Sequence, residues 1–308
     1  MKSILQTPEW AKFKSLTSGW SNFFISDFQV LVRKLPLNKY FFYIPEPSSK
    51  DWKNDLTKIL KESEPEIKKY HPIFIRIEPL EKNTEEINKI LKKSGFKPAF
   101  EEVQPRHRQW VDITTTIEEI LKQMKPKGRY NIKVAEKHNI KITPSTPNTI
   151  EKDLAKFYSL YQETASRDNF TTRPKSYFKT LLENLYQNNL GQLYVATYNN
   201  QPVAGAIITF YKDYALYIYG ASSSSHRNTM APYLIHWQAI KDAKEKGCKI
   251  YDLLAIAPEN ITTHKHVGLN QFKKQFGGES IELTGGWDYI LSPVWYFLFK
   301  TIQKIRRR

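Results

Sequence analysis

The stretch that decides the fold runs QLYVAT at Gln192–Thr197, PVAGAIITFY at Pro202–Tyr211 and YALYIYGA at Tyr214–Ala221. The dipeptides Asn-Asn and Lys-Asp separate these apolar, aromatic-rich runs, and such pairs are typical of tight turns between antiparallel strands. A helical segment over Ala231–Lys246 comes next and stops at a glycine, and a short strand is expected over Lys249–Leu253. This part of the chain is therefore predicted to follow the order strand, strand, strand, helix, strand.

That order of elements is the one that acyl-CoA N-acyltransferases use to hold a thioester. Such enzymes normally place a glycine-rich turn before the helix, where backbone N–H groups and the helix N-terminus cradle a pyrophosphate. Here the connection over residues 222–230 reads SSSSHRNTM and contains no glycine. The sequence therefore predicts an acyl donor other than coenzyme A, and no cofactor.

The composition is that of a folded, strongly basic protein. A chain of 308 residues with 14% aromatic residues can form two ordinary cores, and we expect two. The formal charge of +16 favours anionic partners such as phosphorylated small molecules, nucleic acid or anionic membrane. A lysine-rich, solvated surface is the alternative explanation for the same surplus.

Several classes of site and enzyme are disfavoured by the motifs. Cys248 is the single cysteine, which excludes an internal disulfide, and the seven histidines show no metal-ligand spacing, so no metal site is predicted. A GxSxG elbow, a P-loop and a GxGxxG motif are all missing from the sequence. A hydrolase, a kinase or a dehydrogenase is therefore not expected.

Neither end of the chain resembles a membrane-spanning or secretion signal. Residues 1–9 hold no apolar core, and no run of 18 uncharged apolar residues occurs, so we expect a cytoplasmic protein. The tail Leu291–Arg308 mixes aromatic residues with a cationic end. It predicts either an interfacial helix that makes peripheral contact with anionic membrane, or a helix that docks its aromatics on the core.

A cationic segment precedes the centre of the chain. Its basic residues are Lys122, Lys125, Lys127, Arg129, Lys133, Lys137 and Lys141, against the single acidic Glu136. Arg129, Lys133 and Lys137 recur every four residues and so are expected on one helical face. Like charges at this spacing repel by about 0.2–0.5 kcal/mol per pair, and an RNA backbone would offset that cost. A solvated helix face is the alternative.

The segment QFKKQFGG over residues 271–278 could carry chemistry. Lys273 can point inward between Phe272 and Phe276, where a lysine can stabilise a developing oxyanion. The alternative is an ordinary basic helix end that stops at a glycine pair.

Two arginines and two tyrosines suit a sugar-phosphate ligand. Tyr217 and Tyr219 are two residues apart on a strand and are expected on one face. Arg167 and Arg173, at a helix–helix junction, could grip phosphate with their guanidinium forks. Tyrosines that line a strand core are the alternative.

These segments together resemble the FemABX family of non-ribosomal peptidyltransferases, which add amino acids from aminoacyl-tRNA to peptidoglycan precursors. The similar segments are QTPEWAKFK (6–14), WVDI (110–113), MKPKGRYNI (124–132), RDNF (167–170), YIYGAS (217–222), GCKIYD (247–252) and FKKQFG (272–277). The resemblance spans nearly the whole chain. Each motif alone is weak, FKKQFG is the most diagnostic, and their order is specific.

The resemblance implies an α+β fold of two acyltransferase-like (GNAT-like) domains with mixed sheets flanked by helices. Element order and the prolines of 143–149 place the boundary near residue 147, and the family's chain end returns to the first domain. We therefore expect residues 1–147 plus 286–308 as domain 1 and 148–285 as domain 2. A long heptad insertion is missing, which implies the compact FemX-like branch without a coiled-coil arm.

The resemblance also assigns site residues. Lys14, Arg173, Tyr217 and Tyr219 would hold the phosphates and sugar of a muramyl-peptide, with Arg167 as a rival to Arg173. Glu78 would contribute from FIRIEP (74–79), a segment that matches the family only loosely. Lys273 beside Phe272 would form the transfer site. The basic residues expected to bind tRNA are Lys125, Lys127, Arg129, Lys133 and Lys137.

The expected reaction is aminolysis of an ester. A stem-peptide amine of UDP-MurNAc-pentapeptide or lipid II attacks the carbonyl of an aminoacyl-tRNA, and the protein is expected to act as a monomer. One alternative is a GNAT-like N-acyltransferase acting on a protein N-terminus or an exopolysaccharide unit. Another is a non-catalytic module that binds RNA or membrane.

Overall fold

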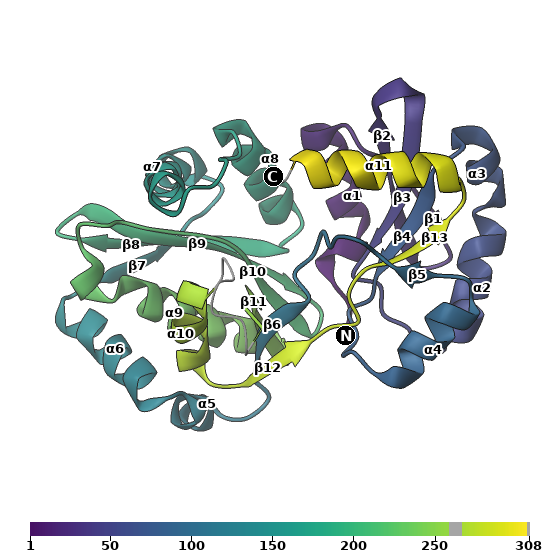
Figure 1. The fold of residues 1–308 in the computed structure, drawn as a ribbon. Coiled ribbons are helices and arrows are strands. Elements are labelled where there is room, and N and C mark those ends of the chain that lie inside the picture. The colour runs from purple at the N-terminus through teal and green to yellow at the C-terminus, as the bar shows by residue number, and fades with distance from the viewer. Residues whose placement is uncertain (259–266, 307–308) are drawn as a thin grey trace. The chain divides into compact units, whose positions relative to one another are not determined.

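The computed structural model describes residues 1–258 and 267–306, and it divides into two compact units (Figure 1). Unit 1 comprises Met1–Arg106 and Glu282–Arg308, and unit 2 comprises His107–Ile281. Each unit is a mixed sheet flanked by helices, which confirms the predicted fold class.

Unit 1 is built on a six-stranded sheet with the order β1-β2-β3-β4-β13-β5. Its strands are β1 (Ser21–Ile25), β2 (Phe28–Leu35), β3 (Lys39–Pro45), β4 (Phe74–Glu78), β5 (Lys97–Pro98) and β13 (Trp287–Ile290). Its helices are η1 (Ile4–Gln6), α1 (Pro8–Ser18), η2 (Pro36–Asn38), α2 (Trp52–Glu62), α3 (Glu64–Tyr70), α4 (Glu85–Lys93) and α11 (Pro293–Arg306). Strands β3 and β4 are parallel, and β13 runs antiparallel to both β4 and β5.

The two faces of the unit 1 sheet are covered by different helices. Because successive strand residues point to opposite faces, neighbours such as Phe41 and Phe42 enter different cores. Phe42 packs in the cluster that contains Leu56 of α2 and Leu91 of α4. Phe41 packs in the cluster that contains residues of α1 and α11. Helices α2 and α4 therefore cover one face, and α1 and α11 cover the other.

Unit 2 is built on a seven-stranded sheet with the order β12-β6-β11-β10-β9-β8-β7. Its strands are β6 (His107–Asp112), β7 (Lys141–Pro144), β8 (Gly191–Tyr198), β9 (Gln201–Tyr211), β10 (Tyr214–Ser222), β11 (Ile250–Ala255) and β12 (Glu279–Glu282). Its helices are α5 (Ile117–Gln123), α6 (Pro126–Lys137), α7 (Ile150–Asp168), α8 (Lys175–Gln187), η3 (Arg227–Thr229), α9 (Ala231–Glu245), α10 (Val267–Lys273) and η4 (Lys274–Phe276). Helices α7 and α8 lie on one face of this sheet, and α6 and α9 lie on the other (Figure 1).

The hairpin strands β8, β9 and β10 form as predicted from the apolar runs at 192–197, 202–211 and 214–221. Asn199 and Asn200 both have positive φ in the turn between β8 and β9, a conformation that Asn tolerates and that suits a tight hairpin. Lys212 has positive φ in the next turn. Helix α9 and strand β11 follow in the predicted order.

The boundary between the units lies at residue 106, whereas the sequence predicts it at residue 147. Strand β6 pairs with β11 through registers such as Asp112 with Ile250, so it belongs to the unit 2 sheet. Thr143 and Pro144, expected to begin a linker, belong to the edge strand β7 of the same sheet. The chain end returns to unit 1 at Glu282, close to the expected residue 286.

Three further expectations concern the described residues only. Over 1–258 and 267–306 no helical arm is inserted in unit 2, where α7 is the longest helix at 19 residues. No helix in these ranges combines the length and apolarity needed to cross a bilayer. Within the same ranges, histidine, cysteine and carboxylate side chains nowhere gather in a group of three able to hold a metal ion.

Candidate active site

The unit 2 sheet opens where β10 and β11 stop pairing. The two strands are parallel partners only over Tyr214–Leu216 and Ile250–Asp252. Beyond these residues lies a cavity of about 210 Å³, lined from several elements. Its lining includes Arg167 of α7, Ala206 of β9, Tyr217 and Gly220 of β10, His236 of α9 and Phe272 of α10. The cavity therefore draws side chains from helices on both faces of the sheet.

A β-bulge in β10 separates the two predicted tyrosines. The register with β9 shifts between Tyr217 and Tyr219, which pair with Ile208 and Ile207. One extra residue reverses the alternation of side chains along a strand. Tyr217 therefore packs edge-on against His236 of α9, with ring centroids 4.5 Å apart, while Tyr219 packs against Phe178 of α8 at 5.0 Å. The prediction that both tyrosines share one face is wrong.

Lys273 is buried directly behind the wall of the cavity. Its side chain is 3% exposed, and Nζ donates a hydrogen bond of 2.7 Å to the carbonyl oxygen of Ala255. Nζ also lies 5.6 Å from the centroid of the Tyr217 ring. Burial lowers the pKa of Lys273 from 10.5 to about 8, opposed in part by the Asp252 carboxylate. The predicted inward orientation of Lys273 is therefore found, and its ammonium remains the main form at neutral pH.

Aromatic rings surround this lysine. Phe272 packs against Tyr233, His236 and Phe276, at centroid distances between 4.9 and 5.5 Å. Nδ1 of His236 is hydrogen-bonded to the Tyr251 hydroxyl at 2.8 Å. Burial, together with the nearby Lys273 charge, lowers the pKa of His236 to about 3. The cavity wall thus presents a neutral imidazole beside a buried ammonium.

A buried ion pair lies next to this cluster, on strands β6 and β11. Nη1 of Arg108 is 3.0 Å from Oδ2 of Asp252, and both side chains are fully buried. The Tyr214 hydroxyl donates to the same carboxylate oxygen. Oδ1 of Asp252 accepts from the backbone N–H of Leu254, a residue with positive φ one position before the Ala255 carbonyl. The carboxylate thereby fixes the backbone that receives Lys273.

Sequence reasoning missed His236, Tyr251, Arg108 and Asp252. A signal existed for Asp252, because a carboxylate inside an apolar strand requires a buried partner. Its partner lies 144 residues away in the sequence and could not be identified from local pattern.

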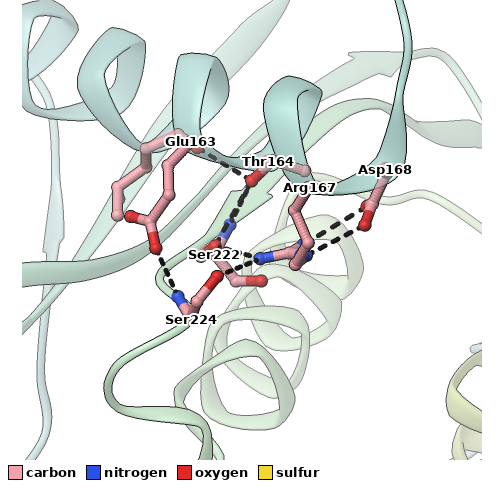
Figure 2. Close-up of polar contacts among 7 residues, drawn as sticks. Glu163, Thr164, Arg167, Asp168, Ser222 and Ser224 are labelled. Atoms are coloured by element: carbon pink, nitrogen blue, oxygen red, sulfur yellow. Dashed lines mark hydrogen bonds and ion pairs between the residues drawn. The ribbon is translucent and has the colours of Figure 1, made fainter.

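Three backbone N–H groups at the start of the connection between β10 and α9 donate to neighbouring elements, two of them drawn in Figure 2. The N–H groups of Ser222 and Ser224 donate to Thr164 Oγ1 and to the Glu163 carboxylate, respectively. The N–H of Ser223 donates to the Val203 carbonyl. A pyrophosphate held at this turn would compete for these donors and would face the Glu163 charge.

Arg167 and Arg173 occupy different surroundings. Nη1 of Arg167 donates to the Ser222 carbonyl at 2.9 Å and to Ser224 Oγ at 3.2 Å, while its Nε pairs with Asp168 (Figure 2). Arg167 therefore fixes the β10–α9 connection at the mouth of the cavity. Arg173 is exposed, and its guanidinium lies 5.4 Å from the Tyr177 ring centroid.

Arg173 belongs to a cluster with Tyr177 and Tyr219. The two hydroxyls are 3.0 Å apart, and Arg173 also interacts with the Tyr219 hydroxyl. Burial raises the pKa of Tyr219 well above 10, so the phenol stays protonated. A cation and two phenol groups on one side of the sheet are suited to hydrogen-bonding an anionic, hydroxyl-rich ligand.

The predicted cationic ridge is only partly present on α6. Lys125, Lys127, Lys133 and Lys137 are exposed, as expected. Arg129 is half-buried, because its guanidinium donates to the carbonyl oxygens of Lys122 and Met124. It caps the end of α5 and does not extend the exposed row.

The start of α6 packs directly against the segment that carries Lys273. The backbone N–H of Lys125 donates to the Gln275 carbonyl at 3.0 Å. Gly128 lies so close to that carbonyl that a Cβ atom would overlap it. The start of α6 is thus held against Gln275, two residues after Lys273, by a tight backbone contact.

The two predicted residues of unit 1 lie in unlike environments. Lys14 Nζ is 3.3 Å from Ser18 Oγ and 5.2 Å from the centroid of the Trp20 ring. Glu78 is buried and accepts from the Tyr43 hydroxyl and the N–H groups of Val103 and Gln104. Burial raises the pKa of Glu78 to about 7. Glu78 therefore anchors residues 103–104 and has little surface left for a ligand.

Comparison with known proteins places this geometry in a family. The family model described as the FemAB family matches residues 88–201 and 189–304. The chain belongs to the FemAB family. The resemblance predicted from the sequence motifs is therefore confirmed.

Individual relatives of this FemAB member support the same assignment. The lipid II:glycine glycyltransferase of Staphylococcus epidermidis is 23% identical, over 99% of this chain and 91% of that protein. Their alignment extends over 390 positions, so the relative carries residues that this shorter chain lacks.

Solved structures show the same fold. A crystal structure of FemX matches with a TM-score of 0.86 at 22% identity, over 97% of this chain and 94% of that one. A tandem GNAT protein from the clavulanic acid pathway matches with a TM-score of 0.50 at 12% identity, over 86% and 79% of the two chains. The FemAB member therefore has the predicted tandem GNAT-like fold.

Proposed function

We propose that this chain transfers an amino acid from an aminoacyl-tRNA to the stem-peptide amine of a peptidoglycan precursor. Family membership and the glycyltransferase relatives give the enzyme class, an aminoacyltransferase. One observation carries the proposal: Lys273, buried behind the cavity wall, lies on the segment that packs against the lysine-bearing helix α6. The proposed transfer site at Lys273 therefore lies close to the start of α6, whose lysines are the proposed surface for a polyanionic carrier.

The reaction is ester aminolysis. The neutral amine of the precursor attacks the aminoacyl carbonyl, and the C–O bond to the terminal ribose breaks as the amide C–N bond forms. The amine loses one proton, and the leaving ribose oxygen gains one. The intermediate carries an oxyanion, which a positioned ammonium stabilises. An ammonium has three donors, so Lys273 can keep its bond to the Ala255 carbonyl and still donate to the oxyanion.

The donor is proposed to approach along α6. Lys125 at the N-cap of that helix and Lys127, Lys133 and Lys137 within it are exposed, and its first turn holds no acidic residue, so this surface can attract phosphates. The connection between β10 and α9 favours a carrier other than coenzyme A, because the N–H groups of Ser222, Ser223 and Ser224 are engaged and Glu163 would repel a pyrophosphate. This feature counts against the alternative of a GNAT-like enzyme that uses acyl-CoA on another amine.

The acceptor is proposed to contact the cluster of Arg173, Tyr177 and Tyr219 in unit 2. The relatives named for their action on lipid II support a muramyl-peptide acceptor. Tyr217 lies beside Lys273 and Tyr219 beside Arg173 because of the bulge in β10, and this supports different tasks for the two tyrosines. We therefore assign Tyr217 and Phe272 to the donor side and Tyr219 to the acceptor side.

A transfer assay tests the proposal. The purified chain is incubated with a mixture of charged tRNAs and either UDP-MurNAc-pentapeptide or lipid II, and the product mass is measured. We expect a precursor heavier by one or more aminoacyl residues, and no product with acetyl-CoA or with uncharged tRNA. Turnover with an acyl-CoA would refute the donor assignment, and tRNA binding without any product would favour a non-catalytic RNA-binding module.

The tRNA surface has its own test. Lys133→Glu/Lys137→Glu is expected to weaken tRNA binding and to reduce the slope of log K against log salt by about 1 for each lysine lost. Lys92→Glu/Lys93→Glu on α4 makes the same charge change on unit 1 and serves as the control. If both variants lose tRNA binding equally, tRNA affinity depends on the net charge of the chain and not on the α6 surface.

A further inference from the structure

Helix α11 has two apolar faces, and only one of them is packed. Trp295, Tyr296 and Phe299 point into the aromatic cluster of Phe41 and Phe74. The outer face carries Val294, Phe297, Leu298, Ile302 and Ile305, whose exposed fractions lie between 42% and 71%. Packing on the core therefore explains the inner face and leaves the outer face without a structural role.

The outer face forms one continuous stripe. At 100° per residue, Val294, Leu298 and Ile305 fall within a narrow sector of the helix, with Phe297 and Ile302 on its two sides. Soluble proteins rarely expose such a contiguous apolar surface unless it meets a partner. We name this stripe of five residues the outer stripe.

Cationic groups flank the outer stripe, and α11 has no acidic residue. Lys300 and Lys304 lie four residues apart along one side of it. Lys39, from the start of β3, places its Nζ 4.4 Å from the centroid of the Trp295 ring. A lysine above a half-buried tryptophan, next to apolar side chains, is an arrangement typical of the interface between lipid headgroups and acyl chains.

The turn between β2 and β3 extends this surface. Leu37 is 76% exposed in that turn and has a φ of 60°. A bulky residue in the left-handed region is uncommon and costs free energy. Core packing does not select an apolar side chain there, because the side chain contacts mainly solvent. Lys39, two residues further on, connects the turn to Trp295.

We propose that the outer stripe, together with Leu37, docks this chain on an anionic lipid bilayer. An apolar stripe flanked by lysines suits a helix that lies in the plane of a membrane surface. A second copy of the chain fits less well, because a pairing of two such helices would bring Lys300 and Lys304 against like charges. Nucleic acid offers phosphates but no apolar surface to cover five aliphatic and aromatic side chains.

The proposal does not depend on the transfer reaction, so it is tested without tRNA or precursor. The full chain is sedimented with phosphatidylcholine vesicles that contain or lack phosphatidylglycerol. We expect binding that requires phosphatidylglycerol and weakens with salt. Phe297→Ser/Ile305→Ser is expected to weaken partitioning by at least about tenfold, while thermal unfolding stays unchanged because both side chains are exposed.

Charge variants show whether membrane binding depends on the lysines beside the outer stripe or on the net charge of the whole chain. Lys300→Glu/Lys304→Glu is expected to weaken partitioning by about tenfold or more. Lys92→Glu/Lys93→Glu changes the net charge by the same amount on α4, which covers the opposite face of the unit 1 sheet. This control is expected to keep most of its binding to anionic vesicles. The proposal is overturned if wild type fails to bind anionic vesicles, or if the outer-stripe variants bind like wild type. It is also overturned if those variants abolish a dimer seen by sedimentation equilibrium without changing vesicle binding.

Discussion

Replacing Lys273 by methionine separates its chemical role from its structural one. Loss of one oxyanion donor typically lowers kcat by about 100- to 1000-fold, or about 2.7–4 kcal/mol. The same change should not unfold the protein. The lowering of the Lys273 pKa from 10.5 to about 8 means that the buried ammonium costs about 3 kcal/mol at neutral pH.

Methionine removes that cost and also removes the hydrogen bond to the Ala255 carbonyl. An unsatisfied buried acceptor costs about 1–3 kcal/mol. The two terms largely cancel, so we expect the free energy of unfolding of Lys273→Met to equal that of wild type or to exceed it by up to about 2 kcal/mol. The variant is therefore expected to be folded, stable and nearly inactive.

The pH dependence provides a second measurement. Between about pH 8 and 10.5 the unfolded wild-type chain binds a proton at Lys273 that the folded chain has lost, so the stability of wild type rises with pH in this window. Lys273→Met should lack that rise. Wild-type transfer should also decline as pH rises through about 8, because the oxyanion donor loses its charge.

Single-turnover transfer from charged tRNA and denaturant unfolding are the two assays. Lys274→Met, which alters the next lysine along the chain, is the matched control and should keep near-normal transfer. Near-normal transfer by Lys273→Met would refute the oxyanion role. Destabilisation by more than about 3 kcal/mol would refute the balance of terms above.

Three other changes test one feature of unit 1 and two features of unit 2. Burial raises the Glu78 pKa to about 7, so the protonated carboxyl contributes fully to stability below pH 4.5, and this contribution is lost as pH rises through 7. The melting temperature of wild type should therefore fall over this pH range, and Glu78→Gln should show a smaller fall. Arg108→Met removes the ion-pair partner of the buried Asp252, which keeps its hydrogen bonds from the Tyr214 hydroxyl and the Leu254 N–H. This change should lower the free energy of unfolding in urea by about 3–5 kcal/mol, less if Asp252→Leu is added. Gly128→Ala places a Cβ against the Gln275 carbonyl, so it should lower the free energy of unfolding by about 1–3 kcal/mol and reduce transfer. Gly268→Ala is the control, because a Cβ there meets open space, and it should change neither stability nor transfer. Stability close to wild type in Arg108→Met or Gly128→Ala, or an unaltered pH profile in Glu78→Gln, would contradict the corresponding argument.

Much of the fold was predictable because its signals are local. The three hairpin strands, α9 and β11 follow from apolar runs and turn residues that lie within 65 residues of one another. The unit boundary was not predictable from such signals. Strand β6 joins a partner about 140 residues away, and the prolines of 143–149 indicate a linker as well as they indicate the end of an edge strand.

The candidate site likewise has some features that local sequence patterns predict and others that they do not. The inward orientation of Lys273 follows from its place between two phenylalanines, and the structure has it buried. The opposite orientations of Tyr217 and Tyr219 depend on a bulge, and a period of two cannot reveal an extra residue. The row of Arg129, Lys133 and Lys137 follows from helical spacing, but its first member turns back to the end of α5.

Strand β13 has a consequence for biosynthesis. It lies between β4 and β5, and its Asp288 receives both the Nε and Nη2 hydrogen bonds of the buried Arg76. The first 106 residues leave the ribosome long before residues 287–290 exist, so the nascent N-terminal part has a gap in its sheet. Its Arg76 then lacks Asp288 and keeps the Glu101 carboxylate, 3.5 Å from Nη1. Unit 2, whose strands are all made before β13, can close first. The earliest-synthesised part of this protein is thus the last to mature, and a chain interrupted after residue 281 would carry an incomplete N-terminal part that chaperones and proteases can recognise.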